Sequence, residues 1–95
     1  MNRYFFHLDL LTDIHVEEEG QDFADLDGAR SAAVQDIRNI AARCLWTGKT
    51  FTLWNVRICN ERGDLLDEVL AAEPIREILP PEIFFDSDPR GLLRP

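Results

Sequence analysis

Four side chains near the N-terminus are of the types that bind metal ions. His7, Asp9, His15 and Glu17 all stand at odd-numbered positions, and alternate residues of a strand share a face. A hairpin that pairs His7 with Glu17 and Asp9 with His15 would bring all four together. Two imidazoles and two carboxylates suit Zn²⁺ or a similar ion. The spacing matches no known metal signature, so a solvated sheet face with incidental charge pairs is the alternative.

The hairpin that would hold these residues is indicated by aromatic and aliphatic residues. Residues 3–10 are rich in aromatics and predict a strand, residues 11–13 predict a turn, and residues 14–16 predict the returning strand. Alternation along both strands then separates a mostly polar face from an apolar one. The predicted apolar face consists of Tyr4, Phe6, Leu8, Leu10, Ile14 and Val16.

An acidic segment follows the predicted hairpin. Residues 17–27 contain no basic residue and six acidic ones, which are Glu17, Glu18, Glu19, Asp22, Asp25 and Asp27. The simplest interpretation is a solvated loop that leads into a helix. The alternative is a mimic of nucleic-acid phosphates that occupies the groove of a basic protein. A calcium loop is not indicated, because the alternating pattern of aspartates is missing.

The rest of the chain completes a two-layer fold. Apolar and small residues recur every three or four positions over residues 26–46, which predicts one long helix. Residues 51–59 predict a strand, residues 60–63 a hairpin turn, and residues 65–71 the returning strand. The order strand, strand, helix, strand, strand predicts an α+β fold: a four-stranded antiparallel sheet (β-β-α-β-β) with one long helix packed on one face. In the second hairpin, we expect Arg57 opposite Asp67 as a surface ion pair.

The remaining sheet face and the C-terminal region suggest an interaction surface. We expect residues 1–73 to form a single α+β domain and residues 74–95 to form a proline-containing appendage. Phe5 and Leu53 are predicted to be exposed on the face away from the helix, and exposed apolar patches often mark contacts. We expect either the appendage or a second copy of the chain to cover this face. The apolar residues of the appendage that would do so are Ile83, Phe84 and Phe85.

Composition excludes several classes of protein. The chain has 95 residues and a formal net charge of −8, so phosphate backbones and anionic membrane surfaces repel it. No apolar run is long enough to cross a bilayer, and the start does not resemble a secretory signal. Cys44 and Cys59 lack the spacing of a metal or redox motif, and no catalytic or phosphate-binding motif occurs. We therefore expect a cytoplasmic protein that is not an enzyme and has no cofactor.

Several short motifs resemble those of a known family. They are Arg3-Tyr4-Phe5-Phe6-His7, the acidic turn Glu18-Glu19-Gly20, Asp25-Leu26 followed by Ala29-Arg30, and the turn from Glu61 to Gly63. Over about residues 1–71 the chain resembles an uncharacterised family, a domain of unknown function found in short alphaproteobacterial proteins that open with this Arg-Tyr-Phe-Phe-His motif. The resemblance implies a bacterial cytosolic origin and no particular activity.

The first functional hypothesis is therefore a small module that acts through contact with a protein partner or by self-association, without direct nucleic-acid or membrane binding. Two alternatives stay open. One is a metal- or small-ligand-binding protein that uses the patch of histidines and carboxylates, and the other is an acidic decoy for a nucleic-acid-binding protein.

Overall fold

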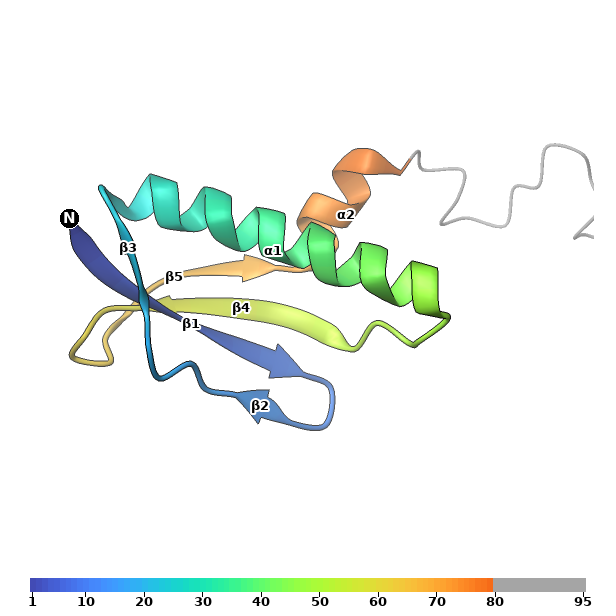
Figure 1. Ribbon diagram of the computed structural model, residues 1–95, viewed down its shortest axis with the longest axis horizontal. Helices are drawn as coiled ribbons and strands as arrows, with labels where there is room; N and C mark the ends of the chain where they lie inside the picture. The colour runs from blue at the N-terminus through green and yellow to red at the C-terminus, as the bar shows by residue number, and fades with distance from the viewer. Residues whose placement is uncertain (80–95) are drawn as a thin grey trace, which may run out of the picture.

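The computed structural model describes residues 1–79 of the chain. Five strands form one antiparallel sheet, and both helices lie over the same face of it (Figure 1). The sheet order is β2-β1-β4-β5, and β3 also pairs with β1. The elements are β1 (Asn2–Leu10), β2 (Ile14–His15), β3 (Gln21–Phe23), α1 (Leu26–Thr47), β4 (Leu53–Cys59), β5 (Leu65–Leu70) and α2 (Ala72–Ile78). This confirms the predicted α+β class, with β3 as a fifth strand inside the segment predicted to be a loop.

Helix α1 begins and ends where its capping residues predict. The Asp25 carboxylate accepts a hydrogen bond of 2.9 Å from the Gly28 backbone N–H, which satisfies one of the free donors of the first turn. At the other end Gly48 has a φ of 73°, a left-handed conformation that favours glycine. Local chemistry therefore accounts for both boundaries of the helix.

The core lies between α1 and the sheet. Ala29, Ala33 and Ile37 are fully buried on the inner side of α1, and the small alanine side chains allow the helix to lie close to the strands. The sheet contributes Tyr4, Phe6, Val56, Ile58 and Val69 to the same cluster. Burying a side chain such as Ile37 contributes about 1.5–3 kcal/mol.

The short strand β3 adds an aromatic residue to this core. Phe23 lies opposite Asn2 and therefore on the helix side of the sheet. Its ring is 5.9 Å from the Phe6 ring in a stacked arrangement and 6.1 Å from the Tyr4 ring. Packing of Phe23 explains why residues 21–23 form a strand in a segment that otherwise has the composition of a loop.

A bulge in β4 changes the predicted position of Leu53. Asp9 lies opposite Asn55, but the next residue of β1, Leu10, lies opposite Leu53, so Trp54 is an extra residue of β4 without a partner in β1. An extra residue reverses the alternation of faces from that point on. Leu53 is therefore buried in the core at 4% exposure, and its predicted place on the exposed face is wrong.

A second irregularity, between Ile58 and Cys59, sets the pairing of β4 with β5. Arg57 lies opposite Glu68, not opposite Asp67, so the predicted Arg57–Asp67 pair is wrong. Asp67 lies opposite Ile58, on the helix side, where it pairs with Arg30 of α1 at 3.0 Å. Arg57 remains on the other face.

Helix α2 crosses the predicted division at residue 73. Pro74 is fully buried, Ile75 packs against the core, and Glu77 lies 3.7 Å from Arg38 of α1. These contacts attach residues 74–79 to the two-layer domain. The division into residues 1–73 and 74–95 stays a prediction. Neither described helix is both long and apolar enough to cross a bilayer.

Candidate functional site

The register of the N-terminal hairpin separates the four predicted metal ligands. Leu8 lies opposite His15, and Asp9 lies opposite Ile14, which is one residue away from the predicted pairing. A slip of one residue moves every side chain of a strand to the other face. His15 and Glu17 therefore lie on the helix side of the sheet, whereas His7 and Asp9 lie on the opposite face. The predicted arrangement of all four on one face is wrong.

Local hydrogen bonds explain this register. The Leu10 backbone N–H donates to the Asp13 carbonyl at 2.8 Å, and the Asp13 carboxylate accepts from the Ile14 N–H at 2.8 Å. The turn therefore closes at Leu10 and Asp13, and this fixes which residue of β2 meets which residue of β1. The sequence does not show whether the turn closes here or one residue away.

Two of the four side chains form backbone bonds in the gap between β2 and β3. The ring Nδ1 of His7 accepts a hydrogen bond of 3.1 Å from the Glu17 backbone N–H, and the Glu17 carboxylate accepts one of 3.2 Å from the Phe6 N–H. Between β2 and β3, these side-chain bonds join the chain to β1 in place of the backbone bonds of a paired strand. Across residues 1–79, no group of three or more His, Cys, Asp or Glu side chains is placed to hold a metal ion.

The sheet face away from the helices, hereafter the outer face, carries a polar cluster. Asn55 donates to the Asp9 carboxylate at 3.0 Å and to the Glu68 carboxylate at 3.3 Å, and Arg57 contacts Asp9 at 3.1 Å. Asp9 is 8% exposed and Asn55 only 2%, so the sheet holds these groups in fixed positions. Among the described residues, the buried Oδ1 atom of Asn55 has no hydrogen-bond donor.

Apolar side chains flank this cluster on the outer face. The pairings align Ile14, Asp9, Asn55 and Leu70 in one row across four strands. The two ends of the row, Ile14 and Leu70, are each about half exposed, and Trp54 beside it is 49% exposed. A shallow depression of about 590 Å³ lies over the Ile14 and Trp54 side of the row. The row therefore has a fixed polar centre and an apolar rim.

The predicted interaction residues have different positions. Phe5 lies on the outer face, as predicted, but it is half-buried. A Cβ atom placed on Gly20 would come within 2.9 Å of the Phe5 ring, so the loop before β3 lies directly against that ring. Leu53 is in the core, as described above. The predicted contacts of Ile83, Phe84 and Phe85 fall outside the described residues.

The acidic segment is partly committed to local structure. Asp22 forms a two-point ion pair with Arg3, the residue opposite it, at 3.0 and 3.2 Å, and this hydrogen bonding lowers the pKa of Asp22. Asp25 caps α1, and Glu17 binds the Phe6 N–H. The other three acids are exposed, and they are Glu18, Glu19 and Asp27. Half of the charges that a phosphate mimic would present thus have structural partners, so the structure favours this alternative less than the sequence does.

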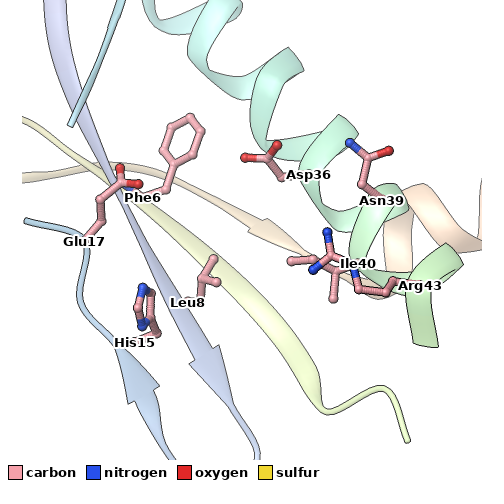
Figure 2. Close-up of a pocket in the computed structure, with 8 residues that line it drawn as sticks. All are labelled: Phe6, Leu8, His15, Glu17, Asp36, Asn39, Ile40 and Arg43. Atoms are coloured by element: carbon pink, nitrogen blue, oxygen red, sulfur yellow. The ribbon is translucent and has the colours of Figure 1, made fainter. Parts of the chain in front are cut away.

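A second candidate site lies between α1 and the edge of the sheet formed by β1 and β2. This cleft has a volume of about 250 Å³ (Figure 2). Its polar lining consists of His15 and Glu17 from the sheet side and Asp36, Asn39 and Arg43 from α1, and its apolar lining consists of Phe6, Leu8 and Ile40. Burial raises the pKa of the Asp36 carboxyl, and the nearby charge of Glu17 raises it further.

The sequence contained one signal of this cleft. Asp36 lies three residues after Ala33 and four before Ile40, and therefore within the apolar stripe of α1. A carboxylate in such a stripe indicates a polar site at the rim of a core. Its partners across the cleft were not predictable, because they depend on the register of β2.

The fold and its two candidate surfaces define a small two-layer α+β domain in which one long helix covers a five-stranded antiparallel sheet. The chain belongs to the family described as a domain of unknown function, DUF6894, whose model matches residues 3–72. This confirms the expected membership of an uncharacterised family. The comparisons found no significant similarity to a curated protein or to a solved structure.

Proposed function

We propose that this protein is a non-enzymatic interaction module that binds a protein partner through its outer sheet face. The row Ile14–Asp9–Asn55–Leu70 carries the proposal, because it combines exposed apolar ends with a rigid, largely desolvated polar centre. Interfaces use such a combination, in which apolar and aromatic groups supply affinity and fixed polar groups supply specificity. Trp54 belongs to a residue type that is enriched at binding hot spots.

The charge of the chain favours a partner other than a second copy. Two copies, each with a net charge of −8, repel each other over the whole surface. Within the polar cluster of the outer face, the two carboxylates of Asp9 and Glu68 stand against one guanidinium, that of Arg57. A partner with an apolar patch bordered by basic residues complements this surface. We place this interaction in the cytoplasm, where the free thiols of Cys44 and Cys59 remain reduced.

Site-specific photocrosslinking of the full chain in its host tests the proposal. A photoreactive amino acid at position 54 should give a discrete crosslinked species, whereas the same group at position 46 should not. Trp46 is a matched control, because it is an exposed tryptophan on α1, away from the outer face. Leu70→Glu should abolish the crosslink from position 54 without unfolding the domain, since Leu70 is half exposed.

The mass of the crosslinked species identifies the occupant. A mass of two chains would show self-association and contradict the inferred partner. Equal crosslinking from positions 46 and 54, or a crosslink that survives Leu70→Glu, would contradict the proposed use of the outer face.

A further inference from the structure

The cleft between α1 and the β1–β2 edge has an acidic end and a basic end. Figure 2 shows the Glu17 and Asp36 carboxylates beside Phe6, with His15 and Arg43 toward Leu8 and Ile40. The pairings support this placement, since Glu17 binds the Phe6 N–H and His15 lies opposite Leu8. Strand β1 and helix α1 run in the same direction (Figure 1). Along this common direction, the sheet side of the cleft changes from Glu17 to His15 and the α1 side from Asp36 to Arg43, so both sides change from acidic to basic.

The acidic end is short of positive charge. Among the described residues, Asp36 forms no ion pair, and the charge that raises its pKa is that of another acid of the cleft, Glu17. A cation between these two carboxylates would relieve both the repulsion and the cost of partial burial. Arg43, at the other end, likewise forms no ion pair within residues 1–79. Its guanidinium and the His15 ring are donors suited to a carboxylate.

The spacing of the backbone positions along each wall indicates how far apart these two ends lie. Asp36 and Arg43 are seven residues apart in α1, which is about 10 Å along a helix. Glu17 and His15 are two residues apart in extended chain, which is about 7 Å. An α-amino acid is too short to bridge this interval. Two residues of extended peptide span about 7 Å, and the volume of about 250 Å³ is slightly below the usual range for small-ligand sites.

We propose that the cleft binds a zwitterion of dipeptide length, with its ammonium between Glu17 and Asp36 and its carboxylate on His15 and Arg43. The apolar floor of Phe6, Leu8 and Ile40 contacts an aliphatic side chain of the ligand. This site lies on the helix side of the sheet, so it is independent of the partner surface proposed for the outer face.

Titration of the full-length protein with the dipeptide alanyl-leucine, followed by amide chemical shifts in NMR spectra, tests the proposal. We expect saturable binding with shifts concentrated at residues 15–17 and 36–43. N-acetylation of the dipeptide removes the ammonium, and C-terminal amidation removes the carboxylate. Each modification should weaken binding by about two- to fivefold, the effect of one partly exposed ion pair.

Variants assign each charge to its end of the cleft. Asp36→Asn should weaken binding of alanyl-leucine but not of its N-acetyl form, and Arg43→Gln should weaken binding of alanyl-leucine but not of its amide. Glu18→Gln and Arg62→Gln are matched controls, because both residues are exposed and neither lines the cleft. Absence of saturable binding at millimolar dipeptide, or equal binding of the free and capped peptides, would overturn the proposal. Shifts confined to the outer face would do so too.

Discussion

Replacement of Gly20 by alanine measures how firmly the loop before β3 holds the ring of Phe5. Gly20 has a φ of 74°, and an added Cβ atom would lie 2.9 Å from both the Phe5 ring and the Arg3 side chain. Gly48 provides a matched control. Its φ is 73°, and an added Cβ atom there would meet nothing within 4 Å. The two substitutions therefore impose the same backbone strain, and only one of them imposes a clash.

The expected magnitudes follow from these geometries. Alanine in the left-handed region costs about 1–2 kcal/mol, and the lower entropy of the unfolded chain offsets about 0.4–1 kcal/mol of this. Gly48→Ala should therefore destabilise the protein by about 1 kcal/mol. Overpacking adds roughly 1–3 kcal/mol, so Gly20→Ala should cost about 2–4 kcal/mol.

Urea denaturation monitored by far-UV circular dichroism gives both free energies of unfolding. The excess cost of Gly20→Ala over Gly48→Ala should shrink when Phe5→Ala is also present, because one of the two clashing groups is then gone. Equal costs for the two glycine substitutions would refute the reasoning. They would mean that the loop moves freely away from Phe5 and leaves that side chain open to solvent.

Three further predictions test burial and charge. In the same assay, Leu53→Ala should lower the free energy of unfolding by about 2–5 kcal/mol. Leu70→Ala should lower it by less than about 0.5 kcal/mol, because Leu70 is half exposed. Equally small decreases for both substitutions would show that Leu53 is not in the core. The raised pKa of Asp36 means that the folded state binds the proton of this carboxyl more tightly than the unfolded state does. The stability of the wild type relative to Asp36→Asn should therefore fall as pH rises from about 4 to neutrality. Urea titrations that show a constant difference between the two proteins over this range would contradict the partial burial of Asp36. Burial raises the pKa of the Cys59 thiol, so Cys59 should react slowly with alkylating agents. Iodoacetamide should therefore modify the partly exposed Cys44 first. Mass spectrometry that finds Cys59 modified first would contradict the buried position of Cys59.

The N-terminal hairpin shows where inference from the sequence stops. Alternation along β1 correctly places Tyr4 and Phe6 in the core, since each strand has only two faces. The same reasoning fails for β2, where Ile14 and Val16 are predicted inside but are more than half exposed. The pattern of one strand cannot reveal how it aligns with its neighbour, and a slip of one residue reverses every face.

The functional residues divide in the same way. The sequence identified His7 and Asp9 as polar residues of the outer face. It did not identify the partners of Asp9, because Asn55 and Arg57 belong to a strand more than forty residues away. The candidate cleft was not predicted at all. It requires both the register of β2 and the position of α1 over the sheet, and no local pattern contains either.

The sequence by itself determined the local features of this protein. It specified the extent of α1 through its capping residues and apolar stripe, the core face of β1, and the α+β class through the order of its elements. These depend on residues a few positions apart. Only the tertiary structure decided the register of β2, the bulge that buries Leu53, and the groups that meet in the cleft. These depend on pairing between distant segments, where one extra or displaced residue changes which side chains meet.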